Sequence, residues 1–245
     1  FDTTDADDPK IISVSGDIYA IVYNGPGSDG WIVTVDIDSA GNIANSVVDS
    51  YEYDTARGLT PHIMNVSGSV FAIAYSGGGS DGMVSTVSIS SLGVITPAVI
   101  DSLEFDTSDG DEPHMINVYG DFYAIVYDGP GGDGWLVTVD INAAGVIANS
   151  VVDSYEFDTS DADNPRIRNV SDDIFAVVYN DVARDGQIFT VDIDTSGNIT
   201  NSIIDSLEFD TGNGATPDLL HVSDDTYLVS YTGRGYYGWV AMFDI

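Results

Sequence analysis

One stretch of this sequence recurs five times at a fixed interval, and that interval constrains the fold more than any other feature. The stretch reads DTSDGDEPHMINV from Asp106 to Val118, and its counterparts begin at Asp2, Asp54, Asp158 and Asp210. Each step is 52 residues long, without an insertion or a deletion. A constant period of this size is typical of solenoids, propellers and arrays of repeated units.

Each repeat contains four short runs rich in Val, Ile, Tyr and Phe, and none of them shows helical periodicity. In the first repeat the runs cover residues 9–14, 17–23, 31–37 and 45–53. The second run is almost wholly apolar in the first four repeats, as expected for a strand that is covered on both faces. Four antiparallel strands in about fifty residues are typical of one propeller blade.

We therefore predict an all-β fold, a five-bladed β-propeller of four-stranded antiparallel blades with an incomplete last blade. The prediction treats residues 1–245 as a single propeller domain. Its repeats cover residues 1–52, 53–104, 105–156, 157–208 and 209–245. A straight stack of the repeats is the alternative layout.

The charge of the chain excludes several classes of partner. Forty acidic residues against six Lys and Arg give a formal net charge of −34, which repels nucleic acid and anionic membranes and attracts cations. No apolar run is long enough for membrane insertion. The acidity is nearly all Asp, which favours turns and hard-cation sites. The scarcity of Lys and the first residue, Phe1, suggest an extracellular or cell-surface location as part of a longer precursor.

Two loops of each repeat carry most of its polar chemistry. The loop after the second strand reads NGPGSDGW in the first repeat, and the loop after the fourth strand reads FDTTDADDP. Because antiparallel strands alternate in direction, both loops are expected on the same side of the fold. If the protein binds a ligand, this is the face that should hold it.

The loop after the fourth strand predicts a Ca²⁺ site in three of the repeats. Repeats one, three and four have Asp at repeat positions 2, 5 and 7, and three carboxylates within six residues could supply several oxygen ligands. These residues are Asp2, Asp5, Asp7, Asp106, Asp109, Asp111, Asp158, Asp161 and Asp163. The alternative is that the first Asp only accepts backbone N–H bonds in an Asx-turn, while the others are solvated charges.

Two further sets of side chains are candidate ligand-binding residues. Trp31, Trp135 and Trp239 follow a Gly beside the acidic loops, where they could stack on a sugar ring or fill the gap between blades. The residue after the Pro of each first strand forms the second set: Lys10, His62, His114, Arg166 and Asp218. In a propeller this position lines the channel mouth. It could form an anion, sugar-acid or catalytic site, or offset the neighbouring carboxylates.

The layout resembles the tandem-repeat propellers of secreted and cell-surface proteins and, more loosely, the tachylectin-type lectins. The resemblance rests on the repeat count, the YxGxGxDGW loop and the four-strand unit, and it implies multivalent glycan recognition. We therefore expect a non-enzymatic binding or surface-adhesion propeller that binds glycans or a surface partner, with Ca²⁺ as its cofactor. One alternative is a glycosidase-like enzyme with its site at the channel mouth. The other is a purely structural surface-layer domain.

Overall fold

The computed structural model describes residues 1–245 and contains nineteen β-strands and three single-turn 3-10 helices. The chain divides into two compact units. The first unit comprises Phe1–Pro113 and Ile141–Ser150, and the second comprises His114–Asp140 and Val151–Ile245. None of the helices has the length and apolar character needed to cross a bilayer. The single-domain assignment and the extracellular location stay predictions.

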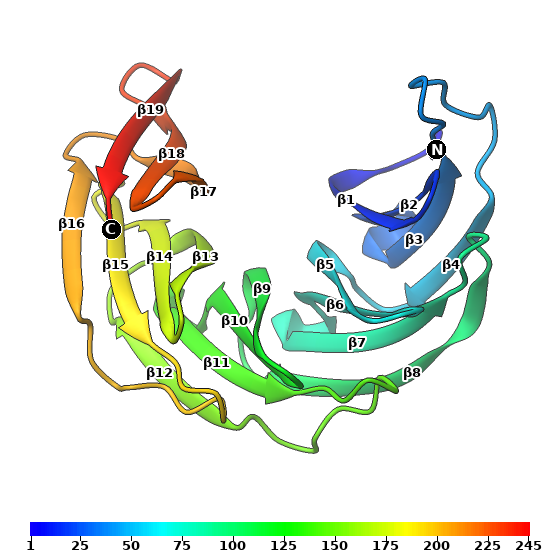
Figure 1. Cartoon of the computed structure of the whole chain (residues 1–245), viewed down its shortest axis with the longest axis horizontal. Coiled ribbons are helices and arrows are strands. Elements are labelled where there is room, and N and C mark those ends of the chain that lie inside the picture. The colour runs from blue at the N-terminus through cyan, green and yellow to red at the C-terminus, as the bar shows by residue number, and fades with distance from the viewer. The chain divides into compact units, whose positions relative to one another are not determined.

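The first unit contains two four-stranded antiparallel sheets, one from each of the first two repeats (Figure 1). Sheet 1 is formed by β1 (Asp7–Ser15), β2 (Ile18–Asn24), β3 (Gly30–Asp36) and β4 (Asp49–Asp54). Sheet 2 is formed by β5 (Leu59–Ser67), β6 (Val70–Ser76), β7 (Gly82–Ile89) and β8 (Ile95–Asp106). In both sheets the strands pair in sequence order, as a meander does.

The second unit contains the other three sheets. Sheet 3 is formed by β9 (Asp111–Tyr119), whose first residues belong to the first unit, β10 (Phe122–Asp128), β11 (Gly134–Asp140) and β12 (Asp153–Asp158). Sheet 4 is formed by β13 (Asp163–Ser171), β14 (Ile174–Asn180), β15 (Gly186–Asp192) and β16 (Asp205–Asp210). Sheet 5 has only β17 (Ala215–Ser223), β18 (Thr226–Gly233) and β19 (Tyr237–Asp244). The 3-10 turns are η1 (Pro26–Ser28), η2 (Gly78–Ser80) and η3 (Pro130–Gly132).

The predicted all-β repeat of four antiparallel strands is confirmed, with a three-stranded sheet in the last repeat. In the first repeat the fourth strand starts later than predicted: it covers Asp49–Asp54 rather than residues 45–53. Its expected beginning lies outside the strand because Ala44 and Val48 bond back to Asp36 and Thr34 from a loop. Closure of the five sheets into a ring stays a prediction, and no sheet closes on itself.

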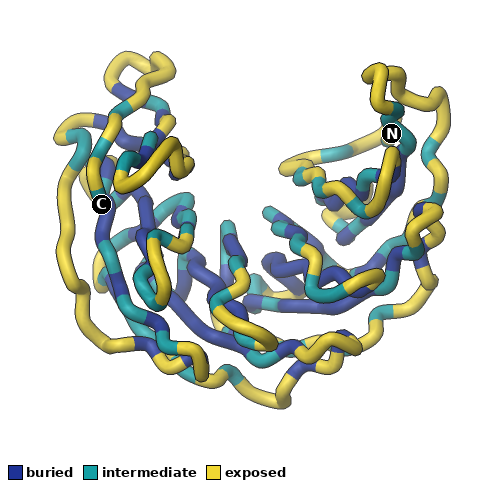
Figure 2. The backbone as a smooth tube through the Cα atoms, in the orientation of Figure 1, coloured by how far each residue is buried: buried dark blue, intermediate teal, exposed yellow.

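The core lies between successive sheets of a unit. Every residue of β6 is buried, because its apolar run is flanked in the sheet by β5 and β7 and covered by side chains of sheet 1. Val22 and Ile32 of sheet 1 share one cluster with Phe71 and Ile73 of sheet 2. Figure 2 shows this pattern in sheets 1 to 4, with buried second and third strands and exposed connections. The sheets are thus stacked face to face through their apolar sides.

Polar contacts fix the register between neighbouring sheets. Asp54, at the end of β4, accepts a hydrogen bond from the Tyr75 hydroxyl of β6 at 2.9 Å. The same contact joins Tyr179 to Asp158 at 2.9 Å. On the opposite side of the sheets, the Thr34 hydroxyl donates to the Gly93 carbonyl at 2.6 Å. These bonds place the loops of one repeat against the next.

Candidate functional site

The two polar loops of neighbouring repeats are hydrogen-bonded to each other. In the first unit, Gly58 donates its N–H to the Ser28 carbonyl at 2.8 Å. In the second unit, Ala162 donates to the Gly132 carbonyl at 2.8 Å. Both kinds of loop therefore lie on one side of the sheets within each unit, as the alternation of strand direction predicts.

The first Asp of each acidic loop is a structural acceptor. The Asp54 carboxylate accepts the N–H groups of Ala56 (2.8 Å) and Arg57 (3.1 Å) in addition to the Tyr75 hydroxyl. Asp158 accepts the N–H and the hydroxyl of Ser160 and the Tyr179 hydroxyl in the same way. The contacts of these residues are those of an Asx-turn.

The second Asp of the loop has a different environment in repeats three and four. Burial raises the pKa of Asp161, and the neighbouring carboxylates of Asp163 and Asp158 raise it further. Burial and the carboxylates of Asp111 and Asp106 likewise raise the pKa of Asp109. A carboxyl group that retains its proton more strongly is suited to general acid–base chemistry. The equivalent Asp5 is exposed.

The predicted Ca²⁺ ligands do not form a compact metal-binding group. No cluster of three or more His, Asp or Glu side chains is arranged to hold a metal ion. Asp163 instead accepts a hydrogen bond from the Asn180 amide at 3.1 Å, and Asp111 lies 3.9 Å from the Arg57 guanidinium. Ca²⁺ binding by the nine predicted residues stays a prediction.

All three candidate Trp side chains pack on their own loops. In each case a Cβ atom at the Gly six residues earlier would overlap the Trp ring; these glycines are Gly25, Gly129 and Gly233. The Trp31 and Trp135 rings are half-buried, and their Nε1 atoms have no hydrogen-bond partner. Trp239, on β19, is 49% exposed. The packing interpretation fits all three residues, while ligand stacking stays a prediction.

Sequence reasoning missed a carboxyl pair beside Trp31 and another beside Trp135. Burial raises the pKa of Glu52, and its hydrogen bond with Asp29 raises it further. The same causes raise the pKa of Glu156 beside Asp133. The available signal was the recurrence of Glu at the last position of the first four repeats, directly opposite repeat position 31 in the sheet register.

The first strand of each repeat contains a strained bulge that sequence reasoning also missed. The residue before the strand's Pro has a left-handed backbone in all five repeats, with φ between 46° and 54°: Asp8, Thr60, Glu112, Asn164 and Thr216. The pairing register shifts at this point, for example between Asp7 and Lys10. A β-branched residue in this region, as at positions 60 and 216, is a backbone outlier, and such strain clusters at functional sites. The X-Pro step at a fixed position was the only sequence signal.

Directly after the bulge lie the candidate channel residues. In the second unit, the His114 ring is buried, and its Nδ1 accepts the Ile167 N–H at 3.4 Å. The neutral imidazole therefore carries its proton on Nε2. Arg166 donates to the Pro165 carbonyl at 2.8 Å. Lys10 and His62 occupy the same repeat position on β1 and β5 of the first unit, where both are half-buried.

The strands β9, β13 and β17 bring the second-unit residues together. Arg168 donates through Nε to the Leu219 carbonyl at 2.9 Å, and its guanidinium lies 3.9 Å from the Asp218 carboxylate. The ion pair is largely exposed, so its attraction is weakened by solvent. Imidazole, guanidinium and carboxyl groups thus lie on the first strands of sheets 3, 4 and 5.

Fold and site together define a β-propeller-like, all-β protein with an acidic loop face. The sequence matches no known protein family and no curated protein. Among solved structures it is similar to two candidate 6-phosphogluconolactonases. The one from Bacteroides fragilis has 16% identity and a TM-score of 0.67, and the one from Bacteroides uniformis has 12% identity and a TM-score of 0.68. Each alignment covers 96% of this chain and 66% of the other.

A third similar structure is a protein of unknown function from Dyadobacter fermentans, at 9% identity and a TM-score of 0.61, covering 98% of this chain and 79% of that one. These likenesses support the propeller-like fold. They do not support the likeness to tachylectin-type lectins. They also overturn the expectation of a non-enzymatic binding or adhesion module, because the similar proteins of described activity are candidate lactonases. The alternative of an enzyme is the better supported.

Proposed function

We propose that this chain forms part of a hydrolase that opens a sugar lactone, with its site at the polar-loop end of the second unit. The proposal rests on three groups of the second unit: the Asp161 carboxyl of raised pKa in the loop before β13, the buried His114 imidazole that accepts the Ile167 N–H of β13, and the Arg166 guanidinium on β13. The likeness of the fold to candidate lactonases supports it.

Lactone hydrolysis needs the kinds of group that this end of the unit provides. Water adds to the carbonyl carbon, the ring C–O bond breaks, and the products are a free hydroxyl and a carboxylic acid. A base must take the proton from the attacking water, and the leaving oxygen must receive one. A carboxyl group whose pKa lies closer to the working pH performs both transfers better than an ordinary Asp. Asp161 has this property and lies on the loop just before β13.

Positively charged groups and N–H donors stabilise the oxyanion that forms when water adds to the carbonyl. His114 presents Nε2–H as a donor because the Ile167 N–H already occupies Nδ1. Arg166 and Arg168 provide permanent positive charge on the neighbouring strand. The net charge of −34 also discriminates between substrate and product. It does not oppose the approach of a neutral lactone, but it repels the anionic acid that is released.

The test is proton release from glucono-δ-lactone, measured in a pH-stat and corrected for spontaneous ring opening. The 6-phospho-lactone is measured in parallel, to show whether the arginines favour an anionic substrate. We expect catalysis by the native chain and a large loss in Asp161→Asn. Asp5→Asn is the matched control, because Asp5 holds the same repeat position but is exposed. A folded protein with no rate above the spontaneous reaction would refute the proposal.

A further inference from the structure

A docking contact repeats between successive sheets and is left open once. The six residues at repeat positions 38–43, which follow the third strand, are here called the connector; the four complete connectors cover residues 38–43, 90–95, 142–147 and 194–199. Three of them dock on the preceding sheet through a Thr hydroxyl that donates to the connector Gly carbonyl. The pairs are Thr34 with Gly93, Thr86 with Gly145 and Thr138 with Gly197, each at 2.6 Å.

A second hydrogen bond secures each docked connector. The N–H of its Ile donates to an Asp carboxylate of the preceding fourth strand. The pairs are Ile95 with Asp49, Ile147 with Asp101 and Ile199 with Asp153, at 2.9, 2.9 and 2.8 Å. Docking buries the Ile side chain: Ile95 is 3% exposed, whereas Ile43, in the connector that has no preceding sheet, is 64% exposed.

Sheet 4 carries the receiving residues of this contact without a connector. Thr190 and Asp205 occupy the positions of Thr138 and Asp153 one repeat later. The Thr190 hydroxyl makes no hydrogen bond, and the Asp205 side chain accepts only the N–H of Ser206. Thr190 is half-buried where its three counterparts are fully buried, and Asp205 is exposed.

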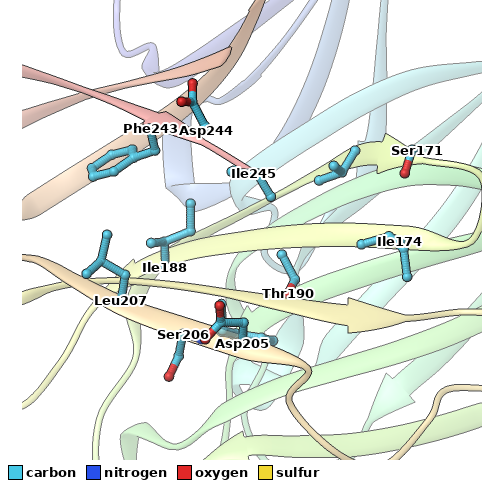
Figure 3. A pocket seen from close by; sticks show the side chains of 12 residues that line it. Ser171, Ile174, Ile188, Thr190, Asp205, Ser206, Leu207, Phe243, Asp244 and Ile245 are labelled. Atoms are coloured by element: carbon cyan, nitrogen blue, oxygen red, sulfur yellow. The ribbon is translucent and has the colours of Figure 1, made fainter. Parts of the chain in front are cut away.

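A cavity of about 500 Å³ lies at this place. Figure 3 shows Thr190 and Asp205 with the apolar side chains of Ile174, Ile188 and Leu207, and the lining also includes Phe243 of β19 and the following Ile245. Leu207 is 51% exposed here. The lining therefore combines the two hydrogen-bonding groups of the docking contact with an apolar wall.

The strand edge next to the cavity is also unpaired. In sheets 1 to 4 the third strand pairs with a fourth, but β19 has only β18 as a neighbour. The exposed residues of β19 include Trp239, Val240 and Met242. A Cβ at Gly30 of sheet 1 would overlap the Tyr53 ring of the fourth strand, whereas one at Gly238 would meet nothing. The edge of β19 thus retains the shape that receives a fourth strand.

We propose that this cavity and the free edge of β19 form a docking site for one kind of occupant, a peptide segment of the repeat's own connector-and-strand type. Its chemistry is set by the filled sites. A Gly with a left-handed backbone, as Gly93 with φ +81°, accepts the Thr190 hydroxyl. An Ile two residues later donates its N–H to Asp205, and the strand that follows pairs with β19 by β-augmentation.

The Gly is required for two reasons. Its φ is unfavourable for other residues, and a Cβ at Gly93 would lie 3.1 Å from the side chains of Ile18 and Val48. A second copy of the chain cannot offer the whole segment, because all four of its fourth strands are already paired. It offers only the exposed connector of the first repeat. The proposal does not depend on the lactonase proposal.

The test adds a synthetic peptide with the sequence of Ser90–Asp106, SSLGVITPAVIDSLEFD, to the 245-residue chain. We expect saturable binding of one peptide per chain, a rise in Tm and a blue shift of Trp239 emission, with Trp239→Phe as the spectral control. A peptide with Gly93→Val should bind at least about tenfold more weakly.

Variants of the chain locate the binding. Thr190→Val should weaken binding about tenfold through loss of the hydroxyl, while Thr138→Val should leave it unchanged because its connector is already in place. The proposal is overturned if the folded chain does not bind the peptide, or if the Gly93→Val peptide binds equally well. It is also overturned if sedimentation shows a dimer that excess peptide does not dissociate, since the occupant is then a second copy.

Discussion

The Tyr75 hydroxyl lies 2.9 Å from the Asp54 carboxylate, and the Tyr75 ring meets the Tyr53 ring edge-on with centroids 5.1 Å apart. Tyr53 and Asp54 end sheet 1, whereas Tyr75 lies in the second strand of sheet 2. The same pair of contacts joins Phe157 and Asp158 to Tyr179. In repeats two and four, the first two residues of the repeat thus link one sheet of a unit to the next.

Removing the Tyr75 hydroxyl should measure how much its hydrogen bond to Asp54 contributes to stability. We expect Tyr75→Phe to lower the free energy of unfolding by about 1.5–3 kcal/mol, because a hydrogen bond to a charged acceptor is lost while the ring contact remains. Urea denaturation followed by circular dichroism provides the measurement. Tyr119→Phe is the control, since this side chain is exposed, and it should change stability little. Equal effects of the two variants would contradict the assignment.

Two glycines at the same repeat position, one beside a fourth strand and one without it, test how tightly the fourth strand packs. Gly30→Ala should destabilise the chain by about 1–3 kcal/mol, because the new methyl group overlaps the Tyr53 ring. Gly238→Ala, at the same repeat position in the three-stranded sheet, should have almost no effect because its Cβ meets no atom. Thermal unfolding of both variants checks this. A similar loss of Tm in both would mean that backbone strain, rather than the ring, requires Gly.

The repeat made the strands predictable because wholly apolar runs such as IYAIVY at 18–23 fit only a strand buried on both faces. The contact of Thr34 with Gly93 could not be foreseen, because it joins residues 59 positions apart through a Gly of ordinary appearance. The left-handed Thr60 was hidden for a related reason, since its conformation follows from the bulge in pairing and not from its own preference.

The candidate site was only partly predictable. The position after each Pro was identified, and the structure places His114, Arg166 and Asp218 on the first strands of sheets 3, 4 and 5. The expectation of a sugar-binding Trp had no physical test in the sequence, because a Trp beside an acidic loop can face a ligand or its own backbone. In the structure Trp31 covers Gly25. The raised pKa of Asp161 depends on carboxylates from three separate loops, which only the fold brings together.

The docking contact predicts a contrast between equivalent Thr residues. Thr138→Val should lower the free energy of unfolding by about 1–3 kcal/mol, because the buried Gly197 carbonyl loses its donor. Thr190→Val should leave stability nearly unchanged, because its hydroxyl has no partner. Parallel urea titrations of the two variants provide the comparison. Equal destabilisation would show that the two threonines have the same environment, contrary to the structure.

Asp161 and Asp210 should respond to pH in opposite directions. The folded chain raises the pKa of Asp161, chiefly through burial and then through neighbouring carboxylates. The folded state therefore holds this proton more tightly than the unfolded state, and stability falls as pH rises from the unfolded pKa through the folded one. For Asp210, burial is outweighed by the N–H groups of Asn213 and Gly212, and its pKa is lowered. Its contribution is present at neutral pH and is lost as pH falls through the folded pKa.

Because the two pKa shifts have opposite directions, replacing each Asp by Asn tests whether Asp161 is catalytic. At pH 7, Asp161→Asn should raise Tm, because it removes a charge that the fold disfavours, whereas Asp210→Asn should lower Tm. The same Asp161→Asn change should reduce lactone hydrolysis by about 10²–10⁴-fold, the usual effect of losing a general acid–base group. Only a group kept for its chemistry makes the chain more stable and less active when it is neutralised. A stabilised Asp161→Asn chain with full activity would place the catalytic group elsewhere, because the ionised Asp161 would then destabilise the fold without contributing to catalysis.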